Sequence, residues 1–202
     1  MAMSNSSEGV PNSIMRIGNA TLEWVNSYKY LGILINANGN FLPTSENLCV
    51  RGWKASFKIK SALKDVDVNP ELQLKLFDTL VKPVICYNGE IWGVMNNVFN
   101  SKNVSQFWER VSKLPVESFQ TKFCKNVLGV HSKAHNGAVM GELGRLPLFL
   151  NIMKSVLKYI VHLDEVKCGR PLLNAAILED EHLCVSKSWR KKSGQNYFIV
   201  SV

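Results

Sequence analysis

The change of residue pattern near residue 42 constrains the fold of this chain more than any other feature. Before it, "IMRIGNATLEWV" at 14–25 predicts a β-hairpin that turns at Gly18-Asn19. "YKYLGILIN" at 28–36 then predicts a third strand, followed by a turn at Asn38-Gly39. After Pro43 the apolar residues recur at helical spacing. We therefore expect a mainly α protein of the α+β kind: a three-strand β segment and then a multi-helix bundle.

Apolar periodicity and capping signals place the helices. Asn69 is expected to cap the second helix, Asn136 to cap the fourth, and Gly129 to end the third. Pro83 should kink the second, because proline removes a backbone donor and clashes with the preceding turn. The polar, Asn-rich residues 94–105 predict a loop. The helices are expected at 45–64, 70–92, 104–127 with an interruption at Pro115, 137–143, 147–166 and 171–181.

Composition and charge narrow the classes of partner and compartment. The chain has 202 residues and a net charge of +8, which points to polyanions such as nucleic acid or to anionic surfaces. No apolar run approaches the roughly 18 residues of a transmembrane helix, so no membrane partner is expected. Five cysteines without a C-x-x-C pair favour an intracellular, reducing compartment, with nucleus and cytoplasm both open. Residues 1–13 are expected to be a disordered lead, and 186–202 form a basic tail.

The sequence gives no sign of catalytic or metal chemistry. It contains no P-loop, no G-x-S-x-G and no H-E-x-x-H motif, and no adjacent Asp pair. Asp65 and Asp67 are interpreted as a turn, and His131 and His135 as exposed loop residues. A third set, Cys168, His182 and Cys184, lacks a tight half-site for zinc. We therefore expect no catalytic residue, no metal ligand and no cofactor.

One edge of the 45–64 helix is basic and carries Arg51, Lys54 and Lys58. Trp53 and Phe57 interleave with these side chains in the sequence. Two interpretations stay open: the edge follows a nucleic-acid backbone through phosphate contacts, or it is an ordinary solvated face of an amphipathic helix.

Four strings, in this order, carry a family resemblance: "SYKYLGILINANGNF", "LKLFDTLVKPVICYNGEIWG", "KFCKNVLGV" and "GELGRLPL". Together they resemble the C-terminal part of the reverse transcriptase of non-LTR (LINE-type, jockey-like) retrotransposons, over roughly residues 14–185. The resemblance implies that 14–42 are hairpins from the edge of a polymerase palm and that 43–185 are the thumb and C-terminal helices. It places Tyr30 and Gly32 in the hairpin beside the primer end, and the helices along a template–primer duplex.

The chain departs from that family at the catalytic core. The metal-binding aspartates of the palm, which hold Mg²⁺ in the complete enzyme, have no counterpart in this sequence. We therefore expect a non-catalytic fragment whose sheet belongs to residues upstream of Met1, which leaves Leu22, Trp24 and Ile33 poorly covered. Its expected partners are an RNA–DNA or other duplex backbone and the missing polymerase core. The alternatives are a nucleic-acid-binding module retained by a host and a helical protein–protein interaction domain.

Overall fold

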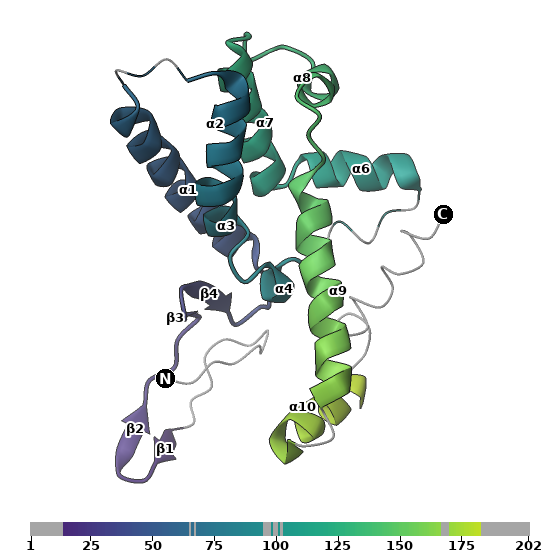
Figure 1. Ribbon diagram of the computed structural model, residues 1–202. Coiled ribbons are helices and arrows are strands. Elements are labelled where there is room, and N and C mark those ends of the chain that lie inside the picture. The colour runs from purple at the N-terminus through teal and green to yellow at the C-terminus, as the bar shows by residue number, and fades with distance from the viewer. Residues whose placement is uncertain are drawn as a thin grey trace.

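The computed structural model describes residues 14–64, 66, 68–94, 98, 101, 103–166 and 170–182. Helices dominate these residues, and two small antiparallel hairpins precede them at one end of the bundle (Figure 1). The expected fold class, N-terminal hairpins followed by a helical bundle, is confirmed. The lead 1–13, the tail 186–202, half of the loop 94–105, Asp65, Asp67, Cys168 and Cys184 lie outside the described residues.

The first hairpin forms as expected, whereas the predicted third strand is wrong. Strands β1 (Met15–Ile17) and β2 (Ala20–Leu22) pair around the Gly18 turn. The "YKYLGILIN" segment instead folds back on itself as β3 (Ser27–Tyr30) and β4 (Ile33–Asn36), which form a separate sheet. Leu31 and Gly32 both adopt positive φ, +46° and +84°, which matches a two-residue turn between twisted strands.

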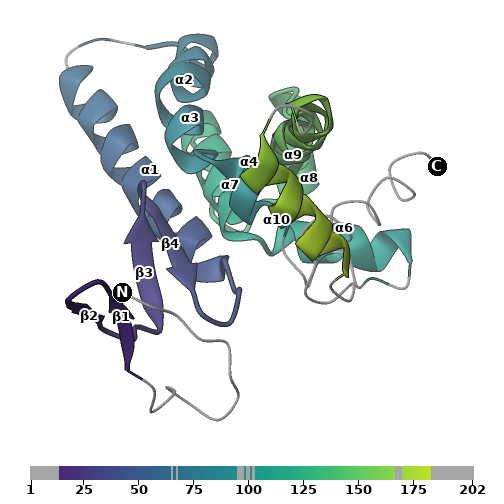
Figure 2. The same cartoon turned by 90° about the horizontal axis from the view of Figure 1, so that it is seen from below.

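The second hairpin belongs to the core, which corrects the expectation that Ile33 is poorly covered. Ile33 is only 2% exposed and Ile35 packs against the same apolar cluster. The Thr44 hydroxyl at the start of the first helix donates a hydrogen bond to the Leu34 carbonyl. Figure 2 shows β3 and β4 beside helix α1 (Leu42–Ala62). The β1–β2 hairpin is different: Leu22 and Trp24 are half-buried, and its other apolar side chains are exposed.

Proline and asparagine decide where the next helices begin. Helix α1 begins at Leu42, three residues before the predicted start, because Pro43 fits within a first helical turn. Helix α2 (Pro70–Leu76) begins after Asn69, whose side chain accepts from the Leu72 N–H at 2.8 Å as predicted. Near Pro83, where a kink is expected, a π-helical turn, η1 (Phe77–Val81), directly precedes α3 (Lys82–Ile85). There the Lys82 N–H donates to the Phe77 carbonyl, five residues back. The single helix expected at 70–92 is wrong, because a turn at 86–88 interrupts it.

The remaining helices follow the expected pattern with one corrected cap. Pro115 begins a new helix and Gly129, at φ +64°, ends it. The predicted Asn136 cap is wrong: Asn136 is the first helical residue of α8, and His135 Nδ1 accepts from the Ala138 N–H at 3.4 Å. The helices are α4 (Gly89–Trp92), α6 (Val104–Ser112), α7 (Pro115–Leu128), α8 (Asn136–Glu142), α9 (Leu148–Val166) and α10 (Pro171–His182).

Aromatic rings fill the space between α1, η1 and α7. Phe119 lies at the centre, with its ring centroid 4.4 Å from Trp53 and 6.2 Å from Phe77. Gly52 allows α1 to pack closely on α3, since a Cβ at position 52 would lie 2.3 Å from Ile85 Cγ2. The long helix α9 contacts α4 and α7 and runs past α4 toward α10 (Figure 1). Within the described ranges, no helix has both the length and the apolar character that a bilayer crossing requires.

Candidate nucleic-acid interface

The basic edge of α1 is continuous along the helix. Lys54 and Lys58 follow Arg51 by three and seven residues, so the three side chains lie on one side of the helix. Lys54 and Lys58 are exposed and Arg51 is half-buried. None of the three forms an ion pair among the described residues. Three cationic groups are therefore available to an anionic partner along about two turns of one helix.

The turn of the second hairpin lies against the start of this edge. A Cβ built on Gly32 would lie 3.6 Å from Arg51 Nη1 and 3.5 Å from Tyr87 Cε1. Gly32, Arg51 and Tyr87 thus meet at one point, although they come from three different elements. Tyr30, on the same hairpin, is 56% exposed. Of the residues predicted to bind nucleic acid, Gly32 and Arg51 therefore lie side by side. Lys54 and Lys58 follow Arg51 along the same side of α1.

Tyr87 is the residue at this point that sequence reasoning missed. It lies in the turn between α3 and α4 and is 45% exposed. The turn is sharp because Asn88, the next residue, adopts φ +50°, a conformation that asparagine tolerates better than most residues. The only signal in the sequence was the Tyr-Asn-Gly triplet, which indicates a turn but not its distance from Arg51.

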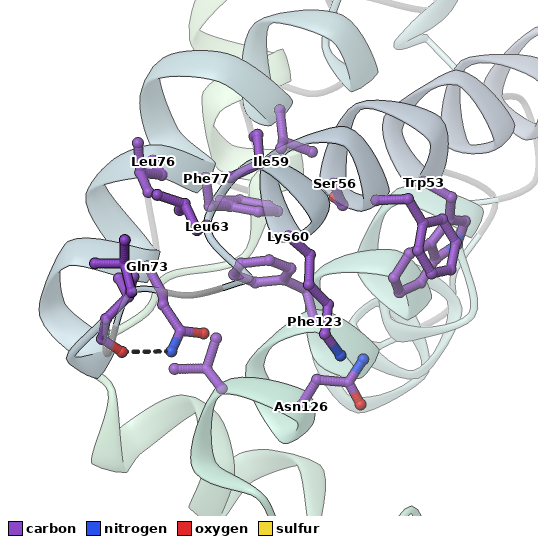
Figure 3. A pocket seen from close by; sticks show the side chains of 15 residues that line it. Trp53, Ser56, Ile59, Lys60, Leu63, Gln73, Leu76, Phe77, Phe123 and Asn126 are labelled. Atoms are coloured by element: carbon purple, nitrogen blue, oxygen red, sulfur yellow. Dashed lines mark hydrogen bonds between the residues drawn. The ribbon is translucent and has the colours of Figure 1, made fainter.

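The two aromatic residues that interleave with the basic side chains of α1 differ in how far they are exposed. Trp53 packs on Phe119 and lines a cavity of about 380 Å³ between α1, α2 and α7 (Figure 3). It faces inward because it lies on the side of α1 that Ser56 and Lys60 share, three and seven residues later. Phe57 also lines this cavity, with its ring centroid 6.3 Å from that of Trp53, but it is 66% exposed and is therefore also accessible beside Lys54 and Lys58.

The carboxylate of Asp78 forms an ion pair with Arg145. Asp78 accepts two hydrogen bonds from Arg145, at 2.6 and 2.7 Å, and the guanidinium also lies 5.4 Å from the centre of the Phe77 ring. The hydrogen bond from Arg145 holds the pKa of Asp78 below its ordinary value. This pair joins η1 to the segment before α9, and it uses both oxygens of the aspartate.

Three cysteines are buried or half-buried, and two histidines accept hydrogen bonds from backbone N–H groups. Burial raises the pKa of Cys49 and of Cys86 to about 12 and that of Cys124 to about 11, so these thiols are poor nucleophiles. His131 Nδ1 accepts from the Lys133 N–H, and His135 caps α8 as described above. In the part of the chain that the structure describes, no three His, Cys, Asp or Glu side chains cluster as a metal site would require.

The start of α9 is held by two polar side chains of α7 that are almost fully buried. Glu117 Oε1 accepts from the Phe149 N–H at 2.6 Å, and Gln120 Oε1 accepts from the Leu148 N–H at 3.2 Å. Gln120 Nε2 also donates to the Leu146 carbonyl at 3.2 Å. Burial raises the pKa of Glu117 to about 7, against the lowering effect of the backbone N–H groups.

Comparison with known proteins supports an origin in a mobile element. A 71-residue part of the chain is 32% identical to an uncharacterized transposon-derived protein of Caenorhabditis elegans. The match covers 35% of this chain and 25% of that protein, so the chain spans about a quarter of the length of this relative. No protein-family model matches the chain. No solved structure matches it.

Proposed function

We propose that this chain is the thumb side of a retrotransposon reverse transcriptase and that it binds the backbone of a template–primer duplex without catalysing synthesis itself. The observation that carries the proposal is the line formed by the Gly32 turn, Arg51, Lys54 and Lys58. A hairpin turn beside three cations that form no ion pair among the described residues suits contact with phosphates, which fix position but carry no sequence information.

The proposed role of the first hairpin follows from its exposed side chains. Ile14 and Ile17 are 70% and 69% exposed, and the β1–β2 pair has free edges within the described residues. Free strand edges with apolar neighbours pair readily with other strands. The missing polymerase core is the partner that the family resemblance suggests for this hairpin.

The test is a titration of an RNA–DNA hybrid at several salt concentrations. Each lost phosphate contact lowers the slope of log K against log salt by roughly 0.9, so R51A/K54A/K58A should lower it by roughly two to three units. The control K113A/K154A/K158A removes the same charge from α9 and from the residue that follows α6, and it should leave most of the slope. An equal loss of slope in both triple variants would show that binding depends on net charge and not on this edge.

A second candidate function, binding of a protein partner, is supported by apolar side chains on the same side of α1. Phe57 is 66% and Val50 53% exposed, and such side chains on one helix face also suit a protein partner. The two functions differ in salt dependence. Self-association or partner binding that persists at high salt and is lost in F57S would favour the protein interface, whereas binding of the hybrid that F57S leaves intact would favour the nucleic-acid edge.

A further inference from the structure

A second group of cationic and hydroxyl side chains lies away from α1 and has no part in the proposed function. It lines a hollow of about 390 Å³ formed by α7, the end of α6 and the loop between α7 and α8. The residues that matter are Ser118, Thr121, Lys122, Lys125, Ser132 and Asn136. Among the described residues that line the hollow, two are lysines and none is acidic.

Lys125 is the unusual member of this group because it is a lysine with little exposed surface. It is only 9% exposed, and its ammonium donates one hydrogen bond, to the Ser132 carbonyl at 2.6 Å. An ammonium has three N–H donors, so two remain. Among the described residues no carboxylate pairs with it. Burial of a cation without an anionic partner is costly, so an anion that entered the hollow would be stabilised there.

The surrounding donors indicate which anion fits. Lys122 reaches the hollow from the turn of α7 before Lys125, and the hydroxyls of Ser118 and Thr121 lie on the same side of that helix. Together with the Asn136 amide, these groups offer more donors than the two oxygens of a carboxylate can accept. A tetrahedral phosphate, with three or four acceptor oxygens, matches this set better.

We propose that this hollow is a binding site for a phosphate group, held by Lys125 and Lys122 with the hydroxyls of Ser118 and Thr121. Because no residue of α1 or of the hairpins lines it, the site is independent of the interface proposed above. The phosphate belongs either to a small phosphorylated compound or to a nucleic-acid backbone, and the test separates these sources.

The test is an amide NMR titration of the full chain with inorganic phosphate at constant ionic strength. Saturable shifts are expected at residues 118–125 and 132–136. K122Q should weaken binding about tenfold and T121V about threefold, while K122R should keep most of it. The control K158Q removes an exposed lysine of α9 and should have no effect. Lys125 itself is left unchanged because it is buried and its replacement would disturb folding.

A short DNA duplex then identifies the source of the phosphate. Displacement of inorganic phosphate from these amides would indicate a phosphodiester backbone. Binding of the duplex that shifts only α1 amides would indicate a small phosphorylated compound. The absence of saturable shifts with inorganic phosphate, or an equal weakening of binding in K122Q and K158Q, would overturn the proposal. In each variant, amide resonances outside the hollow that keep their wild-type positions would show that the protein is folded.

Discussion

The buried carboxyl of Glu117 makes a quantitative prediction about how stability depends on pH. In the unfolded chain this group has a pKa near 4.5, and burial raises it to about 7 in the folded protein. Between these values the folded state binds the proton and the unfolded state does not. The contribution of Glu117 to the free energy of unfolding should therefore be most favourable below pH 4.5 and should fall as pH rises to about 7.

The size of the effect follows from the difference between the two pKa values. One pKa unit corresponds to about 1.4 kcal/mol, so the full loss is roughly 3 kcal/mol above pH 7. Glu117→Gln keeps an oxygen that can accept from the Phe149 N–H and carries no charge. The variant should match the wild type near pH 4.5 and should be more stable by roughly 3 kcal/mol near pH 8.

Urea unfolding followed by far-UV circular dichroism at half-unit steps from pH 4.5 to 8 measures this difference. With an m-value of about 2 kcal/mol per molar, the midpoint of Glu117→Gln should exceed that of the wild type by roughly 1–2 M at pH 8. The comparison cancels groups that titrate alike in both proteins. Parallel midpoints across the whole range would refute the reasoning, because they would mean that the N–H groups at the start of α9 keep the carboxylate ionised.

Three further predictions concern packing. G52A should cost about 1–3 kcal/mol by thermal unfolding, because its methyl group would meet Ile85, although alanine favours helix. R145K should cost about 1 kcal/mol, because lysine cannot keep the bidentate geometry, and a melting temperature equal to that of the wild type would contradict this. Deleting residues 1–25 should leave the melting temperature nearly unchanged, whereas extending the deletion through β4 should cost about 2–4 kcal/mol, since it removes Ile33 from the core.

Local signals in the sequence predicted most helix boundaries correctly. Asn69, Pro115 and Gly129 act at the positions where they were expected, because each controls its own backbone and its immediate neighbours. The second hairpin was missed for the same reason. Leucine rarely adopts positive φ, so only Gly32 signalled the turn, and the apolar alternation on both sides favoured one uninterrupted strand.

Contacts between distant residues could not be predicted in this way. Asp78 and Arg145 are 67 residues apart, and nothing in either local pattern names the other. The polar pair of α7 left a weak signal, since Glu117 and Gln120 interrupt an otherwise apolar face. In the candidate interface, spacing alone placed Arg51, Lys54 and Lys58 on one side of a helix. Only the fold brought the Gly32 turn and Tyr87 to that edge.

Two of the four strings that carry the family resemblance, those at 74–93 and 141–148, contain residues that hold the helices together. Trp92 is fully buried, and its indole N–H donates to the Tyr87 carbonyl at 2.7 Å. A Cβ on Gly93 would lie 2.3 Å from Ile152 Cγ2, so only glycine lets α4 pack this closely on α9. The third such contact is the ion pair of Arg145 with η1. The resemblance to a polymerase thumb can therefore rest on residues that hold the helices together, whereas the duplex binding that we propose rests on a separate set, the cations Arg51, Lys54 and Lys58 of α1.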